Sequence, residues 1–221
     1  MFRIAIDGTA SAGKGSIAKG VARALDWPYV DTGAMYRSIA LLVREAGKDC
    51  QSSLEVIACL DSVEFDFTWT DDQLRVWLNG RDVTPQIRTE EMGGYASQVS
   101  VIPEVRAQLS EMQRSYAAST SLVMDGRDIG TVIIPDAELK VFVDADIEIR
   151  GARRHQELLR RGQNLSLQGV IDDLLERDHR DKSREVAPLK MAEDALLLDT
   201  SHLSIEDGIQ QVLNWHRNLI Q

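Results

Sequence analysis

The sequence predicts an α/β fold in which five parallel strands form one sheet with helices on both faces, together with a small antiparallel β insert. Short apolar runs alternate with helical patterns along most of the 221 residues, which is typical of a parallel sheet between layers of helices. The first apolar run leads through a glycine-rich loop into a helix, and between Val63 and Val83 the apolar period changes to that of a strand.

Five short apolar runs supply the expected sheet. They are Phe2–Asp7, Trp27–Val30, Leu122–Asp125, Leu139–Asp144 and Ala195–Asp199. Because ligands of such sheets bind beyond the carboxyl ends of the strands, we expect the segments that follow these ends to share one crevice. These segments are the glycine-rich loop, Asp31-Thr32-Gly33 and Asp125-Gly126-Arg127-Asp128.

Helical patterns fill the intervals between the apolar runs. We expect helices from the end of the glycine-rich loop to about Leu25, from about Met35, around Leu54–Leu60, over Thr89–Ala118 with an interruption near Pro103, over about Asp146–Arg161, over Ser166 to about His179, and after Ser204 as N-cap.

The middle of the chain predicts a small antiparallel meander over about Val63–Val83. Val63, Phe65, Phe67 and Trp69 alternate with polar residues, and Asp71-Asp72 and Asn79-Gly80 are turn signals. Three aromatic residues on one stripe would suit base stacking, but alternating aromatics more often form a buried sheet face, and we favour that interpretation.

Composition indicates an ordinary globular protein that we expect to form a single domain, residues 1–221. Apolar residues make up 43% and charged residues 27%, and the net charge of −10 argues against a general binder of nucleic acid or membrane surfaces. Cys50 and Cys59 do not form a metal-type cluster. With no signal peptide and no membrane span expected, we predict a cytoplasmic monomer.

The charge is unevenly distributed. Residues 150–190 hold eight Arg and two Lys against seven acidic residues, a net charge of +3 in an acidic chain. This density indicates either a local anionic ligand or a helix face with many ion pairs, and the segment alone does not separate the two.

The loop after the first strand has the form of a phosphate-binding P-loop. Gly8, Gly13 and Lys14 complete the pattern G-x-x-x-x-G-K, and the strand, loop and helix context is met. Backbone N–H groups and the helix dipole would hold phosphate, and Lys14 would reach the outer phosphates. The predicted ATP-binding residues are Gly8, Thr9, Ala10, Ser11, Ala12, Gly13, Lys14, Gly15 and Ser16.

A metal site and a set of cations follow from the same chemistry. Asp125 ends an apolar strand, so it could hold Mg²⁺ directly or through water opposite the Ser16 hydroxyl, with Asp31 as a second candidate. Phosphoryl transfer needs fixed positive charge, and arginine binds phosphate bidentately. Six arginines fall in or beside the crevice segments: Arg37, Arg106, Arg127, Arg177, Arg180 and Arg184.

Several segments together resemble the bacterial cytidylate kinases. Gly-Lys-Gly-Ser at 13–16 has the form found in nucleoside monophosphate kinases, which accounts for Gly15 where a hydroxyl is usual. The resemblance continues in order through residues 31–37, 96–99, 125–131, 177–181 and 184–189. It covers nearly the whole chain, and the β meander falls where these kinases carry an insert.

The resemblance implies roles for individual residues. Ser97, Arg106 and Asp128 would read the cytosine edge, with Thr32 beside the base. Arg37, Arg127 and Arg184 would hold the acceptor phosphate, and Arg177 with Asp181 the ribose. The predicted catalytic residues are Lys14, Arg127, Arg177 and Arg184. Thr9 stands where relatives commonly have Pro, and we expect a slightly looser start of the loop.

The resemblance also implies sub-regions of the domain. The P-loop NTPase-type core would comprise residues 1–31, 119–149 and 185–221, the monophosphate-binding region with the insert 32–118, and an arginine-rich helical lid 150–184.

The implied activity is ATP-dependent phosphorylation of CMP and dCMP with Mg²⁺, on small molecules only. One alternative is a P-loop kinase for another acceptor, such as UMP, AMP or a small metabolite. A more distant alternative is a non-catalytic regulator that binds a nucleoside triphosphate, although the chain has no Asn-Lys-x-Asp motif for guanine.

Overall fold

The computed structural model describes residues 1–60, 63–70 and 73–220, without the side chains at positions 69, 70, 73 and 90. The chain divides into two compact units: Met1–Val30 with Tyr116–Gln221, and Asp31–Ser115. Within the described ranges, no helix is both long and apolar enough to span a membrane.

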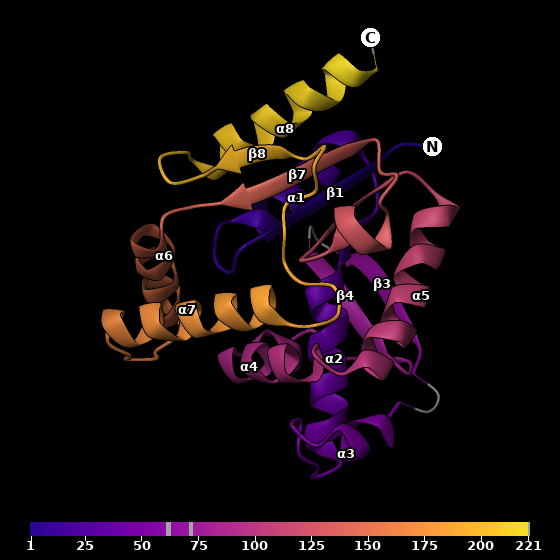
Figure 1. Cartoon of the computed structure of the whole chain (residues 1–221), viewed down its shortest axis with the longest axis vertical. Coiled ribbons are helices and arrows are strands. Elements are labelled where there is room, and N and C mark those ends of the chain that lie inside the picture. The colour runs from indigo at the N-terminus through magenta and orange to yellow at the C-terminus, as the bar shows by residue number, and fades with distance from the viewer. Residues whose placement is uncertain (61–62, 71–72, 221) are drawn as a thin grey trace. The chain divides into compact units, whose positions relative to one another are not determined.

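The first unit is built on the five-stranded sheet, whose order is β2-β6-β1-β7-β8 (Figure 1). β1 pairs in parallel with β6 and with β7, and β7 pairs in parallel with β8. The predicted parallel sheet is therefore confirmed. Its strands are β1 (Arg3–Gly8), β2 (Tyr29–Asp31), β6 (Leu122–Gly126), β7 (Leu139–Asp144) and β8 (Leu196–Asp199).

Helices cover both faces of this sheet. On one face α8 lies so close to α1 that a Cβ atom on Gly208 would stand 2.8 Å from Cδ1 of Ile17. On the other face Ala5 and Met124 pack with Ile129 and Ala117. The helical segments of this unit are α1 (Lys14–Leu25), η2 (Ile129–Ile133), α6 (Ile147–Arg160), α7 (Leu167–Ser183) and α8 (Ile205–Leu219).

The second unit holds the insert. Three strands, β3 (Phe65–Thr70), β4 (Gln73–Leu78) and β5 (Arg81–Asp82), form an antiparallel sheet, which confirms the predicted meander. The remaining elements are α2 (Thr32–Glu45), α3 (Ser53–Ile57), η1 (Gln86–Arg88), α4 (Glu90–Val99) and most of α5 (Pro103–Ser119). Asn79 and Gly80 adopt φ of 49° and 75°, as a tight hairpin turn requires. The predicted turn at Asp71-Asp72 lies outside the described residues.

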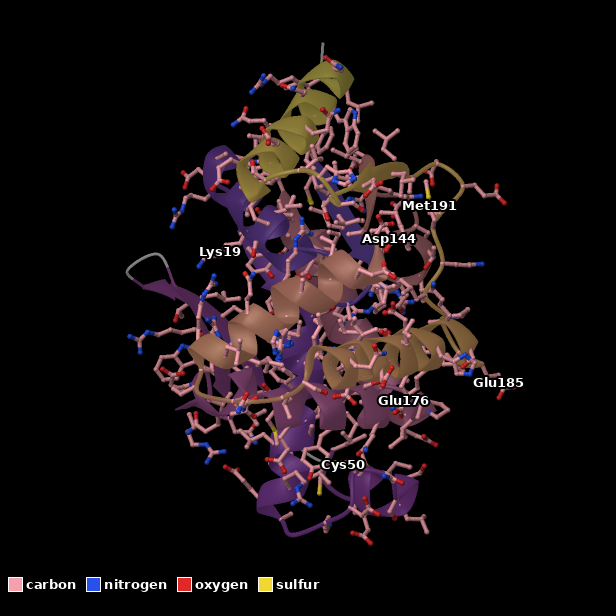
Figure 2. The ribbon with its side chains drawn as sticks, turned by 90° about the vertical axis from the view of Figure 1, so that its left-hand side faces the viewer. Lys19, Cys50, Asp144, Glu176, Glu185 and Met191 are labelled. Atoms are coloured by element: carbon pink, nitrogen blue, oxygen red, sulfur yellow. The ribbon has the colours of Figure 1, made fainter. Side chains whose placement is uncertain are left out.

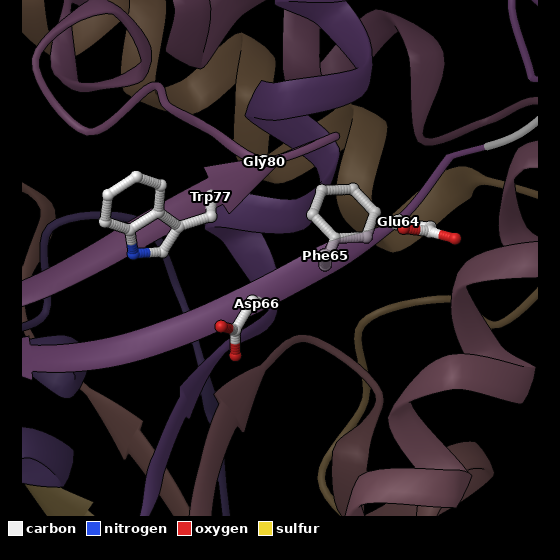
Figure 3. A pocket seen from close by; sticks show the side chains of 5 residues that line it. All are labelled: Glu64, Phe65, Asp66, Trp77 and Gly80. Carbon is white, nitrogen blue, oxygen red and sulfur yellow. The ribbon is translucent and has the colours of Figure 1, made fainter.

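The aromatic stripe of the insert is mainly part of a core, as we favoured. Val63 and Phe65 are buried, and Phe67 packs against the same apolar cluster; the side chain of Trp69 is not described. Phe65 and Trp77 also line a pocket of about 260 Å³ with Glu64, Asp66 and Gly80 (Figure 3). Trp77 donates its indole N–H to Thr68 Oγ1 at 2.8 Å.

Three local expectations need correction. α2 begins at Thr32 rather than near Met35, because the Asp31 carboxylate accepts the N–H of Ala34 and caps the helix directly after the strand. α7 continues past His179 to Ser183. The turn of π-helix at Ile129–Ile133 was not expected from its mixed apolar sequence.

The predicted N-cap at Ser204 is confirmed and generates a prediction for stability. Its hydroxyl accepts the N–H of Asp207 at 3.1 Å, and the Asp207 carboxylate accepts the N–H of Ser204 in return. Ser204→Ala should lower the free energy of unfolding by about 1 kcal/mol, measured by urea denaturation. Ser115→Ala, on the exposed surface of α5, is the control. Equal losses in the two variants would contradict a specific capping effect.

Candidate active site

The P-loop runs from Gly8 to Lys14 at the carboxyl end of β1. Gly8 adopts φ of 151°, and a Cβ atom there would lie 1.9 Å from the carbonyl oxygen of Val143, so only glycine fits. Ser11 and Gly13 adopt φ of 60° and 88°, and left-handed residues of this kind turn backbone N–H groups toward a common anion site. Lys14 begins α1 and is 9% exposed. The loop therefore has the geometry of a phosphate cradle.

Thr9 anchors the start of the loop, which corrects our expectation of a looser start. Its N–H donates to the carbonyl of Val143 at 3.3 Å, and its hydroxyl donates to Asp144 Oδ1 at 2.6 Å. Asp144 is the last residue of β7 and is labelled in Figure 2. A proline could make neither bond. The Thr200 hydroxyl holds the far side of the loop by donating to the carbonyl of Ala12 at 2.8 Å.

Asp125 lies beside the loop at the end of β6. Its Oδ1 accepts the Tyr29 hydroxyl at 2.7 Å, and its Oδ2 would be 3.8 Å from a Cβ atom on Gly15. Within the described residues, no group of three or more His, Cys, Asp or Glu is arranged for a metal. Mg²⁺ in phosphoryl-transfer sites is held by one or two protein oxygens plus substrate phosphates, so a carboxylate beside a P-loop fits that ion.

Arg127, one of the predicted catalytic arginines, pairs with Asp181 in α7. Arg127 Nε donates to Asp181 Oδ2 at 2.7 Å in a largely buried pair. Burial opposes ionisation of Asp181, yet the charges of Arg127, Arg177 and Arg184 together lower its pKa. The pKa of Arg127 is raised against the cost of burial by Asp181, Asp125 and Asp178. Arg127 and Asp181 thus each stabilise the charged form of the other.

Arg184 and Asp128, which the resemblance assigns to the acceptor phosphate and the base, pair with each other. Arg184 Nη2 lies 3.2 Å from Asp128 Oδ1, and the two side chains are 4% and 7% exposed. Arg184 Nε also donates to the carbonyl of Ala187 at 2.6 Å. Arg184 and Asp128 therefore form a buried ion pair in which their charges offset each other.

The other predicted substrate residues belong to the second unit. Arg37 pairs with Asp31 at 2.8 Å, and since the other Asp31 oxygen caps α2, Asp31 is a poor candidate for a metal. Arg106 donates to the carbonyl of Ser100 at 3.2 Å and lies 5.7 Å from the ring centre of Tyr36. Thr32 and Ser97 are buried in α2 and α4.

Asp7 is a site residue that our sequence reasoning missed. It ends the apolar run one residue before Gly8, and its two oxygens accept the N–H groups of Ile129 and Gly130, both at 2.8 Å. Burial is the main cause that raises the pKa of Asp7 to about 7, and the nearby charge of Asp128 raises it further. The two backbone hydrogen bonds and the charge of Lys14 lower this pKa in part. An acid at the end of a strand beside a P-loop was the available signal. Asp7 ties the loop strand to the Arg127-Asp128 segment.

Asp7→Asn should change how stability depends on pH. The pKa of Asp7 rises from 3.8 in the unfolded chain to about 7, so the wild-type protein should lose stability relative to the variant as pH rises from about 4 to about 7. The slope should approach about 1.4 kcal/mol per pH unit. Urea denaturation of both proteins at several pH values measures it, and parallel profiles would contradict the assignment.

Solved structures share the fold of this chain. A protein from Eubacterium ventriosum aligns with a TM-score of 0.56 and 12% identity, over 97% of this chain and 98% of that chain. A sugar kinase from Janibacter aligns with a TM-score of 0.50 and 14% identity, over 98% and 95%. At these identities the likeness concerns the fold alone.

Similarity in sequence is much stronger. A cytidylate kinase from Dichelobacter nodosus is 41% identical over 95% of this chain and 93% of its own length. Those from Carboxydothermus hydrogenoformans and Exiguobacterium sibiricum are 43% and 44% identical, each over 96% of this chain and 96% and 95% of their own lengths. The family model described as cytidylate kinase matches residues 4–218. The chain thus belongs to the cytidylate kinase family, whose members are nucleoside monophosphate kinases.

Proposed function

We propose that this kinase transfers the terminal phosphoryl group of ATP to CMP and dCMP, with donor and acceptor held by the residues described above. The observation that carries the proposal is that Arg127 and Arg184, each paired with a buried carboxylate, lie in the same unit as the P-loop. An acceptor phosphate is ionised at neutral pH, so the reaction needs no general base. Catalysis then rests on positioning and on fixed positive charge.

On the donor side, the backbone of residues 8–16 receives the phosphates and Lys14 reaches the outer ones. Lys14 is well placed for this because it begins α1 directly after the left-handed Gly13. Ser16 and Asp125 would hold Mg²⁺, either directly or through water. That ion, when bound, offsets phosphate charge.

On the acceptor side, Ser97, Arg106 and Asp128 read the cytosine edge with Thr32 beside the base. A carboxylate can accept from the cytosine amino group, and Arg or Ser can donate to the ring nitrogen and carbonyl. Arg37, Arg127 and Arg184 hold the phosphate, and Arg177 with Asp181 the ribose. The arginine-rich segment 150–184 closes over ATP and keeps water from the reacting atoms.

The ion pair between Asp128 and Arg184 suggests how the acceptor binds. Asp128 and Arg184 offset each other's charge in this pair. When CMP binds, its amino group engages the carboxylate and its phosphate engages the guanidinium. Each side chain would then exchange one polar partner for another, which limits the cost of separating the pair.

We also propose that the protein acts as a cytoplasmic monomer on small molecules alone. The net charge of −10 supports the restriction to small molecules, because it disfavours binding to nucleic acids and anionic membranes. Cys50 and Cys59 are both unbonded, as in a reducing compartment.

Lys14→Ala should reduce kcat by at least about 100-fold, because it removes a fixed charge from the developing phosphate charge. A coupled assay that follows ADP formation measures the effect. Lys19→Ala, on the same helix and labelled in Figure 2, is the control. Retained turnover in a folded Lys14→Ala protein would remove the proposed role of the P-loop lysine.

Asp128→Ala should weaken CMP far more than ATP and should lower the preference for CMP over UMP by about 10-fold or more. Uracil presents a carbonyl where cytosine presents the amino group, so only CMP loses a partner. The measurement is kcat/KM for CMP, dCMP, UMP and AMP in the same assay. Equal losses of kcat/KM for CMP and UMP in Asp128→Ala would count against recognition of the base by Asp128. If the wild-type protein phosphorylated only a different monophosphate, that monophosphate would replace CMP as the acceptor.

A further inference from the structure

One ion pair binds both backbone polar groups of a single P-loop residue, Ala10. The N–H of Ala10 donates to Asp178 Oδ1 at 3.3 Å, and the carbonyl of Ala10 accepts from Arg150 Nη1 at 3.1 Å. Arg150 and Asp178 are themselves joined, with Nη1 and Oδ2 2.6 Å apart. Neither residue was singled out by the sequence, and the mechanism above gives neither a role.

The two side chains come from different helices of the lid segment. Arg150 lies in the first turn of α6 and Asp178 lies in the second half of α7. The helices pack against each other so closely that a Cβ atom on Gly151 would lie 2.4 Å from Cγ1 of Ile171. Arg150 Nε also donates to the carbonyl of Ala145, just before α6. The ion pair thus joins the loop to both helices at once.

The surroundings make this contact rigid. Ala10, Arg150 and Asp178 are 3%, 5% and 5% exposed. The Ala10 side chain belongs to an apolar cluster with Leu158, Val170 and Leu174 of the same two helices. A charged pair in such surroundings is strongly coupled, and removing one partner leaves the other charge buried and uncompensated.

The sign of the charges bears on the donor phosphates. Asp178 brings a negative charge to a loop built for an anion, and Arg150 cancels it. If Arg150 is lost, an unbalanced carboxylate faces the loop.

We propose that Arg150 and Asp178 form a positioning pair that holds the P-loop backbone at Ala10, so that the rest of the loop keeps its shape, and fixes the base of the lid helices to the ATP site. The inference rests on the proposed role of the P-loop in binding ATP. It assigns a function to two residues outside the nucleotide-binding set. The lid then moves about this point rather than separating from the loop.

The test is a double-mutant cycle with Arg150→Met, Asp178→Asn and the double variant. Arg150→Met should raise Kd for ATP by about 10-fold or more, because the charge of Asp178 is then no longer offset beside the phosphates. Asp178→Asn should raise Kd less, and the double variant should bind ATP better than Arg150→Met alone. Isothermal titration with ATP in the absence of acceptor gives Kd, and steady-state assays give KM for ATP and for CMP.

Asp136→Asn is the matched control. It removes the exposed partner of Arg3 from an ion pair outside the lid segment, and Kd for ATP should stay within about twofold of wild type. KM for CMP should change by less than about threefold in Arg150→Met. If Arg150→Met does not fold, Arg150→Lys keeps the charge and should retain most of the ATP affinity, whereas Asp178→Asn still reports the loss of the carboxylate.

The outcomes separate this proposal from the proposed function. Additive effects in the cycle, or equal weakening of ATP and CMP, would overturn the positioning pair. Lower thermal stability with unchanged Kd for ATP would reduce the pair to a structural role and overturn it as well. A wild-type protein that binds ATP but phosphorylates no CMP would instead remove the proposed acceptor, and the titrations would still test the pair.

Discussion

The first unit depends on the bond between Asp7 and the backbone of Ile129 and Gly130. β1 and β6 are parallel neighbours, so the P-loop and the Arg127-Asp128 segment leave the sheet at the same edge. The Asp7 carboxylate spans the two by accepting one N–H on each oxygen. Phosphoryl transfer tolerates little misplacement between donor and acceptor groups. A short, buried contact at the end of the central strand meets that demand within this unit.

The P-loop is held from several sides as well as being shaped by its own sequence. Thr9 bonds to the end of β7, the Ala10 peptide bonds to α6 and α7, and the Ala12 carbonyl bonds to Thr200 after β8. Each support comes from a segment more than one hundred residues away along the chain. The loop conformation is therefore a property of the whole sheet edge, which reduces the reorganisation needed when phosphate arrives.

The sequence allowed prediction of the sheet, the meander and most helices, because these follow from apolar periodicity and local caps such as Ser204. The predicted start of α2 was wrong because Thr32 and Gly33 suggested a turn. In the structure Asp31 is the N-cap and the helix begins at Thr32. The residues proposed for nucleotides came from motifs. Pairings such as Arg150 with Asp178 or Arg184 with Asp128 could not be predicted, because they depend on the register between distant segments and have no local pattern.

The pairing of arginines with carboxylates affects how strongly the protein attracts other polyanions in solution. Arg127 and Arg184 each meet an Asp within the first unit, and Arg37 meets Asp31 in the second. An unpaired set of guanidinium groups would attract RNA, polyphosphate and free phosphate from the surrounding solution. Arginines whose charge is offset by a carboxylate attract distant anions only weakly. The association rate of an anionic substrate is therefore raised less by electrostatic attraction. In return, the site discriminates by complementary contact at short range rather than by charge alone.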